Sequence, residues 1–228
     1  MAAGKLHQTI TEILKLPKVA ITMDHTEEGH RLYRYFTKLH PKYLVFRQKT
    51  IGVGLICLND FKNADAYMQS VNGKNSAAYF TRKAQRAGYT FRSIHPIEMA
   101  DAIFAVNTSA ELRQGREMDA SYKTKFTNYP INSNNEYYGV FSGEELVAYL
   151  WVVKSGELAV LSRLLGHAAH LNNGVMYMLI TSYVEKEINE NGRTRFIMYD
   201  TFFGAGEGLK MFKSRCGFKP WRVKWKQA

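Results

Sequence analysis

The chain has 228 residues, 46% of them hydrophobic and 13% aromatic, which is ample for a buried core and typical of a globular, enzyme-sized protein. Its 31 Lys and Arg against 20 Asp and Glu give a formal charge of +11, which favours anionic partners such as nucleic acid, phosphorylated cofactors, acidic carrier proteins or anionic membranes. Cys57 and Cys216 have no Cys or His at zinc-finger spacing, which excludes a disulfide framework and a structural zinc site.

The apolar segments of the chain are short. Its first 18 residues lack the apolar core of a secretion signal. No run approaches the roughly 18 to 20 apolar residues that a membrane-spanning helix needs. We therefore expect no membrane span and a cytoplasmic protein.

The first 60 residues predict strands on either side of one helix. A strand is expected at 19–23, and Asp24 would cap a helix over 27–39. The segments 43–46 and 51–58 alternate or run apolar, and we expect them to form a hairpin.

Helices dominate the segment that follows. Asp60 is a suitable cap for the first of them. Helices are expected at 61–71, 74–88 and 97–112, with a strand at 89–94. The polar residues 113–135 are expected to form a long loop.

From residue 137 the pattern sharpens into a meander of three strands with tight turns, followed by a helix, a strand, a helix and a last strand. These elements are expected at 137–141, 145–153, 158–165, 174–189, 195–200, 207–215 and 218–225. This order favours an α+β sheet protein over a doubly wound one. We predict an N-terminal α/β extension, 1–60, that packs on a core domain, 61–228.

The stretch 208–218 reads Gly-Leu-Lys-Met-Phe-Lys-Ser-Arg-Cys-Gly-Phe. This part of the chain resembles the GNAT acyltransferase fold, in its FemAB-like branch. The resemblance lies in the order of a long helix, a Gly-ended turn, a short strand and a glycine-led helix that carries Phe-Lys and ends near Gly-Phe. The resemblance covers about residues 137–225. It implies a mixed, mostly antiparallel sheet flanked by helices and an enzyme that transfers acyl groups.

Three residues near the C-terminal end are candidate catalytic groups. Many GNAT enzymes have a Tyr where this chain has Lys213, and FemAB-like members resemble this chain in having Phe-Lys there. Lys213 would stabilise the charge of a tetrahedral intermediate or leaving group, or bind a donor phosphate. Asp200, next to Tyr199 at a predicted strand end, would accept the proton of an acceptor amine. The alternatives are a solvated lysine on an amphipathic helix and an aspartate that caps a turn.

The resemblance also implies a donor site. GNAT enzymes hold the pyrophosphate of acyl-CoA on backbone amides, in a loop of pattern Arg or Gln, x, x, Gly, x, Gly or Ala. Arg163, Gly166 and Ala168 fit this pattern directly after a predicted strand, and free N–H groups at a helix N-terminus attract an anion. The alternative is a plain loop between strand and helix.

The long polar segment contains a second group of candidates, Arg113, Gln114, Arg116 and Tyr122. A loop of this length inside a compact domain is often a binding loop, and an Arg pair suits a carboxylate or phosphate through paired hydrogen bonds. We assign these residues to substrate binding, with an ordinary solvated loop as the alternative.

The helix expected at 74–88 supplies a basic surface through Lys74, Arg82, Lys83 and Arg86. The sequence has no standard motif that reads DNA or RNA, but this surface fits tRNA, which FemAB enzymes use as donor. His167 and His170 lack the further ligands that a metal site needs, and we expect no metal.

The residues and the resemblance together predict an N-acyltransferase that moves an acyl group from acyl-CoA to a small or macromolecular amine by direct attack. Two alternatives stay open. One is an aminoacyl-tRNA-dependent, FemAB-like aminoacyltransferase, and the other is a protein on the same fold that binds nucleic acid or modifies a base.

Overall fold

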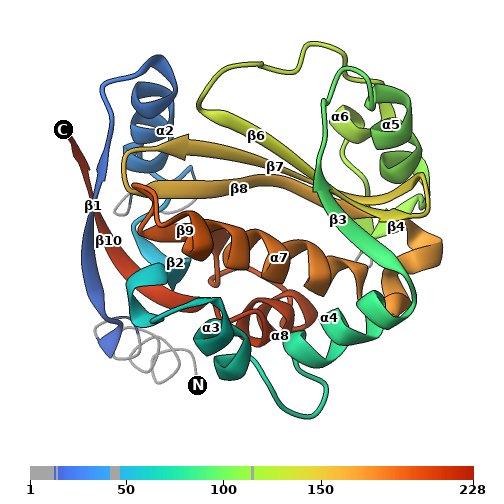
Figure 1. Cartoon of the computed structure of the whole chain (residues 1–228). Coiled ribbons are helices and arrows are strands. Elements are labelled where there is room, and N and C mark those ends of the chain that lie inside the picture. The colour runs from blue at the N-terminus through green and yellow to red at the C-terminus, as the bar shows by residue number, and fades with distance from the viewer. Residues whose placement is uncertain (1–12, 14, 42–46, 114–115) are drawn as a thin grey trace, which may run out of the picture.

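The computed structural model describes residues 13, 15–41, 47–113 and 116–228. Eight of the described strands form one sheet in the order β1-β10-β2-β9-β8-β7-β6-β3 (Figure 1). Their bounds are β1 Lys18–Met23, β2 Ile51–Cys57, β3 Tyr89–Ser93, β6 Asn135–Ser142, β7 Glu145–Ser155, β8 Leu158–Gly166, β9 Phe196–Thr201 and β10 Lys219–Gln227. The predicted meander is present as β6, β7 and β8.

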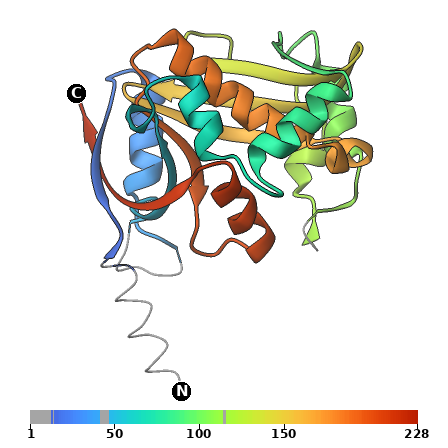
Figure 2. The same ribbon diagram turned by 60° about the horizontal axis from the view of Figure 1, so that its bottom comes forward.

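Most neighbouring strands in this sheet run antiparallel. Among the described strands, β1 pairs with β10 and β8 pairs with β9 in the parallel sense, and the other neighbours are antiparallel. The blue β1 and the red β10, from opposite ends of the chain, lie side by side at one edge of the sheet (Figure 2). The expected α+β class with a mixed, mostly antiparallel sheet is confirmed.

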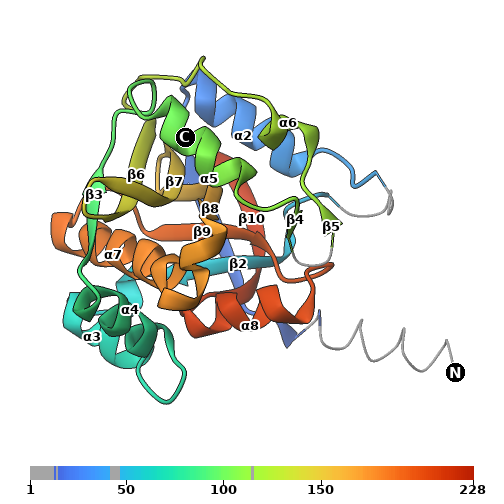
Figure 3. The same cartoon turned by 90° about the vertical axis from the view of Figure 1, so that its right-hand side faces the viewer.

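Helices cover both faces of the sheet. Figure 3 shows α2, α5 and α6 on one side, and α3, α4, α7 and α8 on the other. Their bounds are α2 Glu27–Thr37, α3 Ala64–Ser70, α4 Ala77–Arg86, α5 Ala100–Thr108, α6 Ala120–Lys123, α7 Val175–Glu190 and α8 Glu207–Arg215. The long helix α7 is central to the larger core, where Leu179 and Tyr183 are buried against Tyr138 and Val140 of the sheet.

Two predicted helix caps were wrong by a few residues, and both errors have a tertiary cause. Thr26, not Asp24, caps α2, because the Asp24 carboxylate instead accepts hydrogen bonds from Gly156 N (2.8 Å) and Arg193 Nη2 (2.8 Å). Asn63, not Asp60, caps α3 through Ala66 N. In both segments the capping side chain lies a short way after the predicted one.

The segment predicted as a loop, 113–135, contains short regular elements. Strands β4 (Leu112–Arg113) and β5 (Arg116–Glu117) pair antiparallel in a small second sheet, and α6 follows. The strand expected at 43–46 lies outside the described residues.

The first 60 residues contribute directly to the main sheet. Strand β1 is at its edge, and β2 lies between β10 and β9. Helix α2 packs against β10 and β7 with Leu32 and Phe36 buried. A boundary at residue 60 stays a prediction.

Two glycines let β2 and the end of β9 approach closely. A Cβ at Gly54 would lie 2.9 Å from Tyr199 O, and one at Gly52, where φ is +66°, would overlap the Phe203 ring at 2.2 Å. The register shifts between Val53 and Leu55 at this point, which marks a bulge. The bulge and the glycines fix where the β9 end and its loop lie.

Candidate functional site

Lys213 is a buried cation in the last turn of α8. Only 1% of the residue is exposed. Its Nζ donates a hydrogen bond to Thr201 O (2.7 Å) and lies 4.7 Å from the Tyr199 ring centroid and 5.6 Å from that of Phe202. Burial is the main cause that lowers the pKa of Lys213 to about 8. The nearby Asp200 acts in the opposite direction and raises this pKa, whereas Lys49 lowers it further.

The sequence around Lys213 explains where helix α8 ends. Helix α8 ends in a Schellman motif, in which Phe218 N bonds Lys213 O (3.0 Å) and Gly217 N bonds Ser214 O (3.0 Å). Gly217 has φ +91° and supplies the left-handed residue that this motif requires. The Gly-Phe pair noted in the sequence therefore ends the helix and anchors it through the buried Phe218.

Asp200 lies at the end of β9 in an unusual backbone conformation. Its φ is +46°, a left-handed value that Asp tolerates better than most residues. Oδ1 accepts from Thr201 N (2.8 Å) and from Lys49 Nζ, and 57% of the side chain is exposed. The carboxylate is thus oriented on one side and open to solvent on the other.

Tyr199 connects Lys213 to the rest of the neighbourhood. Its ring lies against Phe218 (5.8 Å between centroids) as well as against the Lys213 ammonium. Burial, with Cys216, Asp200 and Tyr122 nearby, raises the pKa of Tyr199 above its already high ordinary value. Tyr199 is therefore a neutral phenol at physiological pH.

Strands β8 and β9 stop pairing before β9 reaches Tyr199 and Asp200. They pair only at residues 158–160 with 196–198, whereas β8 continues to Gly166 along β7. Arg163 lies in the part of β8 that has no β9 partner, and its guanidinium is 4.4 Å from the Tyr122 ring centroid. Tyr122 is also close enough to Tyr199 to affect its pKa, and Arg163 is linked to the Lys213 group only through Tyr122.

The other two residues of the predicted donor loop are already engaged. Gly166 pairs with Ala148 in the sheet, and a Cβ there would lie 2.8 Å from both Leu171 and Met176 side-chain atoms. Ala168 N donates to Ser109 Oγ (3.0 Å). Ala168 begins the 3₁₀ helix η2 (Ala168–Asn173), which separates the motif from α7.

The polar-loop candidates lie on β4, β5 and α6. The backbones of Arg113 and Arg116 pair in the register of β4 and β5, and Tyr122 in α6 packs against a core cluster around α5. Gln114 lies outside the described residues. The structure places Tyr122 beside Arg163.

The basic residues predicted to contact nucleic acid are exposed on and before α4. Arg82 Nη2 bonds Asn72 Oδ1 (2.7 Å), and Lys83 Nζ bonds Asn172 O (2.8 Å). Lys74 precedes the helix and Arg86 is in its last turn. All four cations are therefore open to solvent.

Lys49 belongs to the site, and sequence reasoning missed it. It lies in the turn ahead of β2, 151 residues from its partner Asp200. A single polar residue in a short turn carries no recognisable signal. Only the pairing of β2 with β9 in the folded chain brings the two side chains together.

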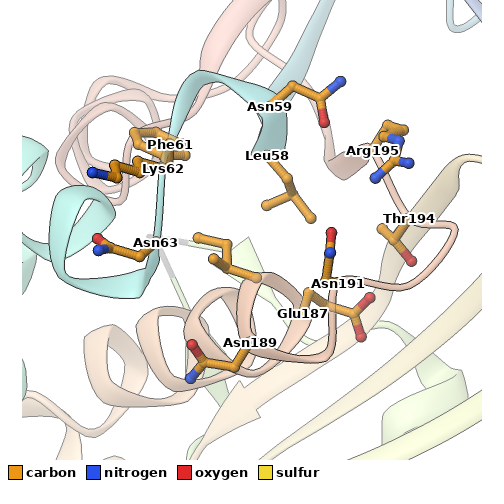
Figure 4. A pocket seen from close by; sticks show the side chains of 11 residues that line it. Leu58, Asn59, Phe61, Lys62, Asn63, Glu187, Asn189, Asn191, Thr194 and Arg195 are labelled. Carbon is orange, nitrogen blue, oxygen red and sulfur yellow. The ribbon is translucent and has the colours of Figure 1, made fainter.

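A polar pocket of about 490 Å³ lies at the other end of β9 (Figure 4). Asn59 and Lys62 line it from one side, and Glu187, Thr194 and Arg195 from the other. Thr194 and Arg195 come directly before β9, whereas Asp200 is near the end of that strand. None of the candidate residues that the structure describes lines this pocket.

Two general properties of the described residues bear on the predictions. None of their helices is both long and apolar enough to cross a membrane. Over the same residues, no three His, Cys, Asp or Glu side chains are grouped so that they could hold a metal ion.

Comparison with known proteins shows similarity in structure but not in sequence. No protein-family model matches the chain, and no curated protein matches it. Among solved structures, FemX is similar with a TM-score of 0.57 and 10% identity, over 86% of this chain and 65% of FemX. The C-terminal domain of a putative lysylphosphatidylglycerol synthetase from Agrobacterium fabrum has a TM-score of 0.52 and 13% identity, over 76% of this chain and 58% of that one.

A tandem GNAT protein from the clavulanic acid biosynthesis pathway is also similar, with a TM-score of 0.49 and 17% identity, over 76% of this chain and 51% of that one. The chain spans less than two thirds of each of these three structures. The resemblance to the GNAT fold, and to its FemAB-like branch through FemX, is confirmed. At such low identity the similarity establishes the fold, and the activity has to be argued from the site.

Proposed function

We propose that this protein is an N-acyltransferase in which an amine attacks the carbonyl carbon of an activated acyl donor directly. One observation carries the proposal. The buried Lys213 ammonium and the half-exposed Asp200 carboxylate lie together at the end of β9, where this strand no longer pairs with β8.

A buried ammonium without an ion-pair partner lowers the stability of the folded protein. Desolvation disfavours the charged form, and among the described residues Lys213 takes part in none of the ion pairs within 4.0 Å. Its firm contacts are a neutral carbonyl and two aromatic faces. Such an ammonium is poised to stabilise negative charge that develops on a substrate oxygen or sulfur.

The two charged groups divide the chemistry. The amine nitrogen forms a bond to the acyl carbon, and the carbonyl oxygen takes the electron pair as an oxyanion. The intermediate collapses when the bond to the leaving thiolate or alkoxide breaks, and the amide remains. Lys213 stabilises the negative charge on the oxyanion or leaving group, and Asp200 accepts the proton that the attacking nitrogen loses.

Tyr199 has a supporting part in this scheme. It is neutral, and its ring lies against the ammonium, so it contributes a cation–π contact without cancelling the charge. A salt bridge at the same position would neutralise Lys213. The aromatic contact thus leaves the charge of Lys213 unneutralised.

Acyl-CoA is the donor we put first. Arg163 lies in the part of β8 that pairs with β7 but not with β9, and its guanidinium is stacked on Tyr122. An arginine held in this way suits a phosphate. In this proposal Arg163 carries most of the phosphate binding, because the Ala168 amide already donates to Ser109 Oγ.

That engaged amide also favours the second candidate, an aminoacyl-tRNA donor. Such a donor places its acyl ester at the site and its phosphates on a broad basic surface. The exposed Lys74, Arg82, Lys83 and Arg86 are the residues for this role.

A thermal-shift panel at low and moderate salt tests the proposal. Acetyl-CoA, longer acyl-CoAs, free CoA, bulk tRNA and duplex DNA are each added to the wild type and to Arg163→Met. Stabilisation by a CoA species that persists at moderate salt and is lost in Arg163→Met supports acyl-CoA. Salt-sensitive binding of tRNA alone moves the aminoacyl donor forward. Amide formation from neither donor with a panel of amines contradicts acyl transfer altogether.

A further inference from the structure

Lys49 is held more firmly than a surface lysine. Its N–H donates to Phe36 O (3.1 Å), and its carbonyl accepts from Trp225 Nε1 (2.6 Å). Phe36 and Trp225 in turn pack with ring centroids 4.8 Å apart. The backbone of Lys49 is therefore fixed by α2 and β10 together.

The side chain of Lys49 is directed by this anchoring. It is 17% exposed, and its Nζ makes an ion pair with Asp200 Oδ1. The same Nζ lies 6.0 Å from the Tyr35 ring centroid. A lysine that is covered along its length and fixed at its backbone loses little freedom when it holds one partner.

Asp200 has two cations within electrostatic reach but pairs with one of them. Within the part of the chain that the structure describes, the ion pairs include Lys49–Asp200 and do not include Lys213–Asp200. Both Asp200 and Lys49 nevertheless affect the protonation of Lys213. The choice of partner therefore decides whether Lys213 keeps an unneutralised charge.

We propose that Lys49 is a positioning residue of this site, which holds the Asp200 carboxylate and keeps it from closing an ion pair with Lys213. The inference rests on the proposed function, because it explains how a carboxylate and an ammonium can stay separate and do different work. Without Lys49, Asp200 would turn to the nearest remaining cation. Lys213 would then be neutralised, and Asp200 would no longer be free to accept a proton.

The protonation of Lys213 reports on this arrangement without any substrate. The titratable groups around Lys213 come from three segments. They are Tyr199 and Asp200 in β9, Lys49 ahead of β2, and Cys216 at the end of α8, which lies near Tyr199. Lysine labelled with ¹³C at Cε gives a signal for Lys213, assigned by its absence in Lys213→Met. Its titration midpoint is measured by NMR in the wild type, Lys49→Met, Asp200→Asn and the double variant.

The double-variant cycle separates positioning from simple loss of charge. In Lys49→Met, the Lys213 midpoint should rise by about one pH unit or more, as a newly formed ion pair produces. In the Asp200→Asn background no carboxylate is present to pair with Lys213. The same Lys49→Met change should therefore raise the Lys213 midpoint clearly less than it does in the wild type. An equal rise in both backgrounds, or no rise in either, overturns the proposal.

Controls guard against a general loss of structure. Lys210→Met removes a partly exposed lysine of α8 that pairs with Glu207 and should leave the Lys213 midpoint unchanged. Lys49→Arg keeps the charge and should restore most of the wild-type behaviour. A midpoint in Lys49→Arg that matches Lys49→Met speaks against charge pairing as the cause.

Activity gives the second arm of the test. With a donor that is turned over, Lys49→Met should lower kcat between about ten- and a hundred-fold with little change in KM, and the alkaline limb of the pH profile should move in step with the Lys213 midpoint. An unchanged kcat overturns the role of Lys49 in the reaction. A shifted midpoint in a protein that turns over no donor supports the positioning and contradicts the acyl transfer.

Discussion

Lys213 Nζ donates to the main-chain carbonyl of Thr201 at 2.7 Å, so that the last turn of α8 is bonded to the end of β9 by a buried charge. The pKa of Lys213 is lowered from 10.5 to about 8, which means that the folded protein binds the proton of this ammonium less well than the unfolded chain does. This single contact joins the stability of the fold to the proposed chemistry.

Replacing Lys213 by Met should make the protein more stable and much less active. A shift of this size corresponds to about 3 kcal/mol, and the lost hydrogen bond to Thr201 O offsets about 1 kcal/mol of it. We therefore expect the free energy of unfolding at pH 7 to rise by about 2 kcal/mol in chemical denaturation. Turnover should fall by about 10²- to 10³-fold, as when one donor to an oxyanion is removed.

The sign of this effect depends on pH. Because the folded pKa lies below the unfolded one, the unfolded chain binds more protons between about pH 8 and 10.5. The wild type should then gain stability as pH rises through this window, and the advantage of Lys213→Met should disappear near its upper end. Lys210→Met, the partly exposed control on the same helix, should show no such window. A constant difference between Lys213→Met and wild type at all pH values would contradict the buried ammonium.

The rate should have a matching alkaline limb. If the charged form of Lys213 stabilises the intermediate, kcat should be highest below pH 8 and should fall as pH rises through about 8. The measurement is kcat against pH at saturating donor. A kcat that instead increases through pH 8 would indicate that neutral Lys213 acts as a base, and would exchange the proposed roles of Lys213 and Asp200.

Asp200→Asn isolates the proton acceptor. Asn tolerates the φ of +46° at this position as Asp does, so the variant should fold normally. It should lose about 10²- to 10⁴-fold in kcat, the usual contribution of a general base. Asp200→Ala serves as the comparison, because Ala at this φ adds backbone strain and should lower the melting temperature. If Asp200→Asn keeps the wild-type rate, another group takes the proton.

The sequence could predict what local patterns determine. The meander β6 to β8 follows from alternating side chains and Gly turns, and α8 from Glu207–Arg215 agrees with its expected bounds because its Gly-Phe end is a local signal. The fold class and the candidate Lys213 could be named from the same features. The sequence could not show that Lys213 is buried, because an amphipathic helix with three basic residues usually has its lysines exposed to solvent.

Long-range partners account for the remaining differences. Asp24 was predicted to cap a helix, but its partners Gly156 and Arg193 are more than 130 residues away. The same holds for Lys49 and Asp200, which meet only because β2 is placed beside β9. Ala168 matched the spacing pattern of a donor loop, but this pattern cannot show that the Ala168 N–H donates a hydrogen bond to Ser109 Oγ.

A final prediction concerns Gly54, which has no part in the chemistry. A Cβ at this position would lie 2.9 Å from Tyr199 O and 3.3 Å from Asp200 O, both main-chain atoms that cannot rotate away. Gly54→Ala should therefore displace the end of β9, lower the free energy of unfolding by about 1 to 3 kcal/mol, and reduce kcat even though no charged group is removed. Chemical denaturation and steady-state kinetics measure the two effects.

Gly192→Ala is the matched control for this change. A Cβ at Gly192 has nothing within 4 Å, so the variant should match wild type in stability and rate. If Gly54→Ala loses stability but keeps kcat, the position of the β9 end matters less for Asp200 and Lys213 than the structure indicates. If it loses both together, β2 is established as the support that sets the geometry of the site, with Lys49 acting on one side of Asp200 and the strand backbone on the other.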